Sequence, residues 1–309
     1  ETQGNELDQA KTLEVIGNAV EELKGLVNLD AEGCYETPAV TSDSEELQNT
    51  LQKLQKYGTV TITYRFGDNI EVLDGSTIST WLEVDGFAVT LDQTQVENYV
   101  ATLRKKYDSI FRSRTFMTSY GKEITVDGGD YGWWMNYQQE AKELAAQIET
   151  GESGERTPVY YQTAASYGAP DYGDTYVEIN LTAQHLFFYK DGQLVMESDF
   201  VSGNSARGYD TPEGTYSITY KQRNATLVGE NYETPVSYWM PFNKNIGMHD
   251  ATWRASFGGI IYKTKGSHGC INMPYEKAQE LYGYIEKGTP VICYHLAGTE
   301  RSTESELEK

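Results

Sequence analysis

The stretch GSHGCIN, residues 266–272, places a histidine and a cysteine between glycines, in a chain with three cysteines and four histidines. A cysteine attacks as its thiolate, and an ordinary thiol has a pKa of about 8.5, so it needs a base or a positive potential nearby. Gly266 and Gly269 let the backbone bend tightly and let a substrate approach. Such bends can aim N–H groups at one point, so we expect the N–H groups of Gly269 and Cys270 to form an oxyanion hole.

Two histidines are candidates for the base that activates Cys270. His268 lies two residues before the cysteine, but a base usually comes from another segment of the fold. His249, in the segment NIGMHDATW, lies 21 residues upstream (270 − 249) and is followed by Asp250. Two neighbouring strands would bring His249 beside Cys270, where a neutral imidazole takes the thiol proton and returns it to a leaving amine.

Zinc binding is an alternative for two histidines and a cysteine. No Cys-x-x-Cys or His-x-x-x-His spacing supports it, and a structural zinc site takes four ligands. We therefore expect no metal and no cofactor. A purely structural role also stays open, because cysteine is among the residues most often buried in cores. Cys293, in the apolar segment TPVICYHL, is expected in the core, and Cys34 in a loop.

The elements that would position these residues divide the chain into two parts. Apolar periodicity predicts helices in the first part over residues 6–27, 42–57, 92–107 and 137–149. After the small, polar segment TGESGERTP, strand-like runs dominate, with a hairpin turn at Asp191-Gly192 and one clear helix after Pro274. We expect an α+β domain over residues 1–155, followed by a mainly β domain, a β-sandwich with one clear helix, over residues 156–309.

The composition excludes several classes of partner. The chain of 309 residues carries a formal net charge of −21. Non-specific binding to nucleic acid or to an anionic membrane surface depends on basic patches, so we expect neither. No apolar run long enough to span a bilayer occurs. Because the chain begins at Glu1, we expect an N-terminal signal or membrane anchor that this sequence does not contain.

The spacing around the cysteine resembles a family signature. His249, then residues 250–266, then SHGCIN is similar to the signature of the L,D-transpeptidase (YkuD-type) catalytic domain. YVEINLTAQHLFFYKDG resembles the opening hairpin of that domain, TPEGTY its turn and GTPVICY its closing strand, so the resemblance covers residues 174–296. ITYRFGDNIEVLDGSTISTWL and TFMTSYGKEITVDGGDYGWWMN resemble the peptidoglycan-binding domain that precedes it in Gram-positive enzymes.

The resemblance implies a secreted enzyme of cell-wall biogenesis and cell shape. Cys270 would attack the carbonyl that joins the third residue of a stem tetrapeptide to its terminal D-alanine. D-alanine would leave, and the amine of a second stem would convert the thioester into a 3→3 cross-link. Water in place of the amine would make the enzyme an L,D-carboxypeptidase. Carbapenems would acylate Cys270.

The resemblance also implies roles for other residues. His249 would be the base, Ser267 or Asp250 would orient it, and His268 would line the site. Segment 221–245 would form a lid. The remaining candidates for substrate binding are Tyr238, Trp239, Arg254 and Asn272. Of these, Arg254 would bind a stem carboxylate in bidentate fashion, and Asn272 would brace the loop or cap the following helix, whereas aromatic residues are more often packing.

Two other functions stay open. A non-catalytic wall-binding protein would have kept the fold and lost the chemistry, but the intact Ser-His-Gly-Cys and His249 disfavour it. A cysteine protease would cleave ordinary L-peptides. Incubation with muropeptides and casein side by side would separate the protease from the transpeptidase.

Overall fold

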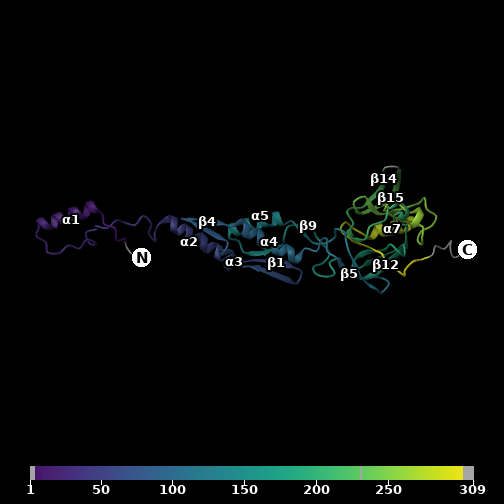
Figure 1. Ribbon diagram of the computed structural model, residues 1–309, viewed down its shortest axis with the longest axis horizontal. Helices are drawn as coiled ribbons and strands as arrows, with labels where there is room; N and C mark the ends of the chain where they lie inside the picture. The colour runs from purple at the N-terminus through teal and green to yellow at the C-terminus, as the bar shows by residue number, and fades with distance from the viewer. Residues whose placement is uncertain (1–3, 230–231, 302–309) are drawn as a thin grey trace. The chain divides into compact units, whose positions relative to one another are not determined.

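The computed structural model describes residues 4–229 and 232–301 (Figure 1). The chain forms two compact units, each assembled from three segments. The first unit comprises Glu1–Thr63, Val72–Val96 and Lys142–Glu155, and the second comprises Tyr64–Glu71, Glu97–Ala141 and Arg156–Lys309. The chain therefore passes between the units several times, and the single boundary predicted near residue 155 stays a prediction.

The first part of the chain mixes helices with short strands, as the sequence predicts. Its helices are α1 (Gln9–Glu21), α2 (Glu45–Gly58), α3 (Gly75–Ser79), α4 (Gln93–Tyr107) and α5 (Tyr137–Thr150). Its strands are β1 (Ile62–Phe66), β2 (Asn69–Leu73), β3 (Leu82–Asp85), β4 (Ala88–Leu91), β5 (Arg114–Met117), β6 (Glu123–Val126), β7 (Trp134–Met135), β8 (Gly154–Arg156) and β9 (Tyr160–Gln162). They form a three-stranded sheet, β2-β1-β8, and pairs β3-β4, β5-β6 and β7-β9.

The later part of the chain is mainly β, which confirms the predicted fold class. Its strands are β10 (Tyr176–Asn180), β11 (His185–Lys190), β12 (Gln193–Asp199), β13 (Gly214–Ser217), β14 (Gln222–Gly229), β15 (Tyr232–Asn243), β16 (Ile246–Asp250), β17 (Ile271–Met273) and β18 (Pro290–Tyr294). Its helices are η1 (Ser205–Arg207), α6 (Tyr262–Lys265) and α7 (Tyr275–Tyr284).

Two sheets share one hydrophobic core in the second unit. The five-stranded sheet has the order β12-β11-β10-β18-β13, and the four-stranded sheet has the order β14-β15-β16-β17. The core joins both sheets and α7, with buried side chains that include Ile179, Phe188, Met240, Ile271, Leu281 and Val291. All five residues of β18 are buried, among them Cys293, as its apolar sequence predicts. The sheets therefore give β16 and β17, which hold the candidate site, a rigid backing.

The hairpin between β11 and β12 turns where the sequence predicts. Asp191 and Gly192 have φ angles of +50° and +75°. Two consecutive left-handed residues match the twist of the flanking strands, and Asp-Gly accepts that conformation at low cost.

Helix α1 departs from the expected packing. It is shorter than predicted, and its apolar side chains Leu13 and Val20 are 72% and 68% exposed. The contacts that fix this region are polar: the Asp8 N–H donates to the Cys34 carbonyl at 2.9 Å, and the Asp8 carboxylate caps α1 by accepting from the Lys11 N–H. Cys34 is fully buried and free, in the loop that the sequence predicts.

Candidate active site

Two parallel strands bring the predicted nucleophile and base together. In the pairing of β16 with β17, His249 lies opposite Asn272 and Met248 lies opposite Ile271. Cys270 directly precedes β17, and the alternation of side chains along a strand places it on the same face as Asn272 and His249. Both side chains line one cavity of about 240 Å³, whose lining residues are Leu227, Thr234, His249, Trp253, Arg254, Gly266, Ser267, His268, Cys270 and Asn272.

The turn before Cys270 is tied to the loop around η1. The Ser267 N–H donates to the Ser202 carbonyl and the Asn204 N–H donates to the Ser267 carbonyl, both at 2.9 Å. A side chain at Gly266 would clash, because its Cβ would lie 2.6 Å from Asn204 Cα. Gly269 has a φ of +119°, which favours glycine. These contacts hold the turn in one shape.

The Ser267 hydroxyl braces this turn from inside. It donates to the Cys270 carbonyl at 2.6 Å and accepts the Gly269 N–H at 3.0 Å. The prediction that the Gly269 N–H forms part of an oxyanion hole is therefore wrong in this structure, because that donor is already engaged. The same contacts make Ser267 a support for the nucleophile rather than an orienter of His249. The Cys270 N–H as an oxyanion donor stays a prediction.

The main chain of Asp250 orients His249. The ring Nδ1 lies 2.8 Å from the Asp250 carbonyl oxygen. The Asp250 carboxylate instead accepts the N–H groups of Ser237 and Tyr238 on β15, each at 2.8 Å. Of the two predicted orienters, it is Asp250 that contacts the ring, through its backbone.

The other ring nitrogen of His249 contacts Asn272, and this contact settles the tautomer. The Arg254 Nε–H donates to Asn272 Oδ1 at 2.8 Å, and Asn272 Nδ2 lies 3.0 Å from His249 Nε2. A guanidinium only donates, so the amide oxygen of Asn272 must face Arg254 and its NH₂ group must face the ring. His249 Nε2 is therefore the acceptor, and Nδ1 carries the proton that goes to Asp250.

Both reacting groups are neutral at rest. Burial lowers the pKa of His249, which is 3% exposed. Burial raises the pKa of the Cys270 thiol to about 11. The thiol sulfur lies 3.6 Å from the Asn245 carbonyl oxygen, and among the described residues no hydrogen bond joins it to His249. Transfer of the thiol proton to Nε2 would require the sulfur to turn from the Asn245 carbonyl toward the ring.

The raised pKa predicts how Cys270 reacts with iodoacetamide. The shift from 9.0 to about 11 lowers the thiolate fraction at neutral pH about 100-fold. We expect the alkylation rate of Cys270 to rise about tenfold per pH unit between pH 6 and 9.5, without a plateau. Peptide mapping by mass spectrometry would follow Cys270 alone, and in the urea-unfolded chain the rate should begin to level off above about pH 8.5. A plateau near pH 7 in the folded protein would contradict this result.

The two aromatic candidates on β15 face opposite sides of the sheet. Tyr238 is 2% exposed and belongs to the core, where its ring centroid lies 5.6 Å from that of Tyr275. The prediction that Tyr238 binds substrate is therefore wrong. Trp239 clusters with Cys270, and its ring centroid lies 5.9 Å from that of His249. Trp239 packs against these two residues and is not among the residues that line the cavity.

The remaining candidates lie around the cavity. His268 is exposed, and its ring centroid is 4.8 Å from that of Tyr209. Arg254 also donates from Nη1 to the Lys265 carbonyl at 2.9 Å. Two of its nitrogens are thus engaged within the protein, and binding of a carboxylate by Arg254 stays a prediction. Trp253 lines the cavity, and its ring centroid lies 5.9 Å from that of His249.

The predicted lid segment is a long hairpin. Strands β14 and β15 protrude from the second unit in Figure 1. Leu227 on β14 and Thr234 on β15 line the cavity. The sequence does not predict either residue as part of the site, because nothing in their local pattern distinguishes them from other positions in an exposed hairpin.

Comparisons with known proteins agree with this geometry. A YkuD family model, described as "L,D-transpeptidase catalytic domain", matches residues 174–293. A crystal structure of a cysteine-to-serine mutant of the Enterococcus faecium L,D-transpeptidase is 36% identical, and the alignment covers 80% of this chain and 100% of that chain with a TM-score of 0.64. The chain belongs to the L,D-transpeptidase family. It is therefore an acyltransferase of a family that cross-links peptidoglycan.

Further comparisons also match this L,D-transpeptidase. A model described as "Putative peptidoglycan binding domain" matches residues 40–156. A structure described as the Ldtfm–avibactam carbamoyl enzyme is 36% identical, covering 80% of this chain and 98% of that chain with a TM-score of 0.64. An NMR structure of the E. faecium catalytic domain acylated by ertapenem is 45% identical, covering 40% of this chain and 98% of that chain with a TM-score of 0.37. No match was found among curated proteins.

Two further findings concern the described residues 4–229 and 232–301. They contain no cluster of three His, Cys, Asp or Glu side chains that could hold a metal ion. None of their helices is both long enough and apolar enough to cross a membrane.

Proposed function

We propose that this L,D-transpeptidase forms 3→3 cross-links in peptidoglycan through a thioester on Cys270. The observation that carries the proposal is the placement of Cys270 and His249 in one cavity, with the unprotonated Nε2 of His249 on the side of the ring that Asn272 contacts. A neutral imidazole with an unprotonated nitrogen is the state in which histidine accepts a proton. The relative described as an avibactam carbamoyl enzyme supports covalent chemistry in this family.

The reaction begins when the Cys270 thiol attacks the carbonyl between the third stem residue and D-alanine. As the S–C bond forms, the Asn272 amide gives up its hydrogen bond to His249 Nε2 and the thiol proton moves to that nitrogen, while the Asp250 carbonyl holds the resulting imidazolium through Nδ1–H. The C–N bond then breaks, and His249 returns the proton to the departing amine of D-alanine. A thioester and a neutral imidazole remain.

In the second half of the reaction, the Cys270 sulfur changes from nucleophile to leaving group. The amine of a second stem attacks the thioester carbonyl and loses a proton to His249 Nε2. The C–S bond breaks, and the sulfur takes that proton back as the thiol reforms. Water in place of the amine gives the L,D-carboxypeptidase reaction. The ratio of cross-linking to hydrolysis therefore depends on how well the cavity excludes water. Because the substrate is the cell wall, the proposal includes an extracellular location and a role in cell shape.

Labelling with a carbapenem tests the proposed nucleophile. We expect the intact mass of the wild-type protein to rise by the mass of one carbapenem, because the strained ring acylates Cys270. The adduct should disappear in Cys270→Ala. Cys34→Ala is the matched control, because it also removes a buried free cysteine but lies outside the cavity, and it should keep the adduct.

The reaction itself requires a second measurement. Incubation with disaccharide tetrapeptides should release D-alanine and give a dimer whose tandem mass spectrum shows a 3→3 bond. If the wild-type protein takes no adduct and makes neither dimer nor tripeptide, the proposal is wrong. Cleavage of casein instead of muropeptides would assign the site to a protease.

A further inference from the structure

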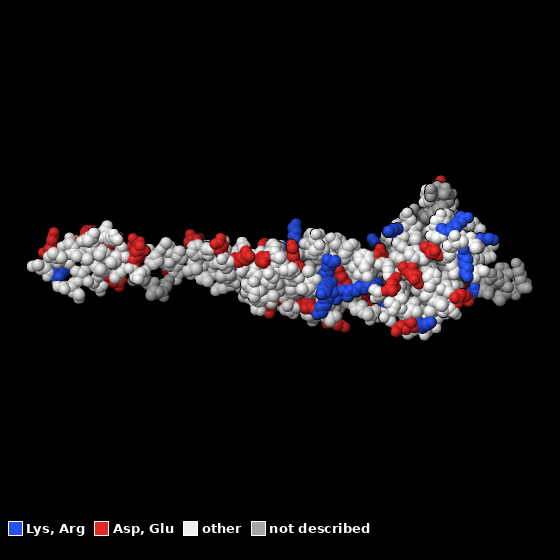
Figure 2. Space-filling view, in the orientation of Figure 1, with Lys and Arg blue, Asp and Glu red and all other residues white. Residues whose placement is uncertain are grey.

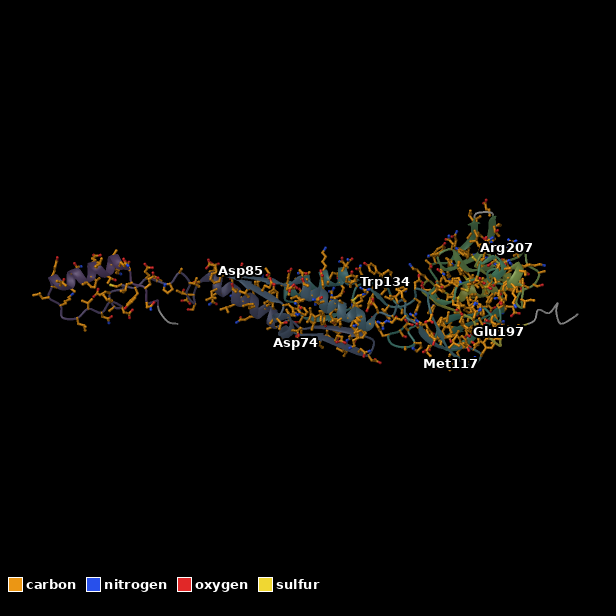
Figure 3. The ribbon with its side chains drawn as sticks, viewed as in Figure 1. Asp74, Asp85, Met117, Trp134, Glu197 and Arg207 are labelled. Atoms are coloured by element: carbon orange, nitrogen blue, oxygen red, sulfur yellow. The ribbon has the colours of Figure 1, made fainter. Side chains whose placement is uncertain are left out.

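Three aromatic side chains lie exposed on the second unit, and none of them lines the cavity around Cys270. Phe111, Trp134 and Tyr161 are 67%, 37% and 54% exposed, and Trp134 is labelled in Figure 3. The ring centroids of Phe111 and Trp134 are 6.3 Å apart, and those of Trp134 and Tyr161 are 4.8 Å apart. We call these three residues the aromatic strip. Contiguous exposed apolar surface is a feature of binding sites.

The backbone of Phe111 is strained. Its φ is +59°, in the left-handed region that bulky residues rarely adopt. The loop is held there because Ser109 and Ile110 both donate their N–H groups to the Trp133 carbonyl, at 3.1 and 3.2 Å. Glycine would adopt this φ without strain. An exposed phenylalanine in a glycine conformation does not serve folding, and strained residues of this kind cluster at functional sites.

Basic residues lie close to the strip along the chain, although two of them, Arg104 and Lys106, form ion pairs with Asp108 and Glu71. Four basic residues fall within residues 104–112 of a protein with a net charge of −21, namely Arg104, Lys105, Lys106 and Arg112. The Arg104 guanidinium lies 4.8 Å from the ring centroid of Tyr137, which is 37% exposed. Figure 2 shows one dense cluster of Lys and Arg among otherwise scattered charges. An acidic protein repels an anionic polymer in general, so local positive charge favours binding at one place.

We propose that the aromatic strip binds the glycan strand of peptidoglycan, with pyranose rings stacked on Phe111, Trp134 and Tyr161. The C–H groups on the face of a pyranose are weakly positive and apolar, and the face of an aromatic ring carries negative charge density. The carboxylates of the attached stem peptides would then meet the neighbouring basic residues. The identity of the polymer rests on the proposed function.

The size of the catalytic cavity supports a separate glycan surface. At about 240 Å³, the cavity around Cys270 is smaller than the sites that enclose drug-sized ligands, which begin at about 300 Å³. Its volume accommodates part of a stem peptide. Binding the glycan elsewhere would keep the enzyme on its polymeric substrate and raise the local concentration of stems.

The test measures binding of peptide-free glycan strands, prepared by amidase digestion of sacculi, to the full chain. All proteins carry Cys270→Ala, so that no acylation takes place. By isothermal titration calorimetry, we expect Trp134→Ala and Phe111→Gly to raise the Kd by about tenfold or more. Phe111→Gly should keep or raise the Tm, because glycine relieves the strained φ. Phe87→Ala, which removes a ring that is 40% exposed outside the strip, should bind as the parent does.

Three outcomes would overturn the proposal. The parent protein could fail to bind peptide-free glycan, or Trp134→Ala and Phe111→Gly could bind it with unchanged Kd. Loss of affinity for isolated stem peptides alone would show that the strip binds peptide. Carbapenem acylation of the strip variants with Cys270 intact should equal that of the wild type. Failure of the wild-type protein to be acylated would overturn the proposed function without affecting the glycan result.

Discussion

Replacing His249 by glutamine is expected to slow acylation of Cys270 by a carbapenem about 10²–10⁴-fold at pH 7, because the reaction loses its general base. Burial raises the pKa of the thiol to about 11, so very little thiolate exists without a base. Mass spectrometry of quenched samples would give the rate of adduct formation. His295→Gln removes an exposed histidine outside the cavity and should react at the wild-type rate.

The stability of the same variant provides an independent check. Burial lowers the pKa of His249 below its ordinary value of 6.5. As the pH falls below 6.5, the unfolded chain binds the proton first, so the native protein loses stability until the lowered pKa is passed. His249→Gln should remove this part of the acid sensitivity in urea unfolding between pH 7 and 5. If His249→Gln is acylated at nearly the wild-type rate, His249 is not the base.

The chemistry of the site could be predicted from the sequence because it depends on local spacing. His249 and the stretch that ends in Cys270 lie on two short segments, and an apolar run next to each of them predicts a strand. Parallel pairing of β16 with β17 in the observed register then places the two side chains on the same face of the sheet. The hairpin at Asp191-Gly192 is predictable for the same reason, because its turn chemistry is contained in two residues.

The orientation of individual side chains could not be predicted in this way. Tyr238 and Trp239 are neighbours on one strand, and alternation requires that they face opposite sides. Which of them faces the core depends on where α7 and the other sheet pack, and the sequence of β15 does not contain that information. Ser267 was similarly ambiguous, because a hydroxyl donates and accepts in many directions and only the three-dimensional turn shows that it bonds to Cys270 and Gly269.

The largest difference between the predicted and the observed site concerns the roles of Asn272 and Arg254. Both are candidates for substrate binding from the sequence, Arg254 as a bidentate partner of a stem carboxylate and Asn272 as a residue that braces the loop or caps the following helix. In the structure they form a chain of hydrogen bonds from Arg254 through Asn272 to His249 Nε2. That chain joins residues 18 and 23 positions apart in the sequence. It gives Asn272 a positioning role, which leads to the second large effect.

Asn272→Asp is expected to reduce acylation at pH 7 by about 10²-fold or more and to shift the pH profile upward. A carboxylate can accept from Arg254, but it cannot donate to His249 Nε2. It therefore favours a proton on Nε2, which raises the pKa of His249 and converts the base into an imidazolium. The imidazolium cannot take the thiol proton, so activity should recover as the pH rises and the proton is lost. Acylation rates measured from pH 5.5 to 9 would show this shift.

Asn272→Ala separates the effect of charge from the loss of a contact. It removes the donor to Nε2 without adding a carboxylate, so it should lower the acylation rate less than Asn272→Asp and leave the midpoint of the pH profile unshifted. Alkylation with iodoacetamide tests the alternative, in which Cys270 and His249 form a thiolate–imidazolium ion pair. If Asn272→Asp is alkylated at Cys270 faster than the wild type at pH 7, the new imidazolium lowers the pKa of the thiol. Cys270 and His249 would then work as an ion pair, and the assignment of His249 as a neutral base would have to be abandoned.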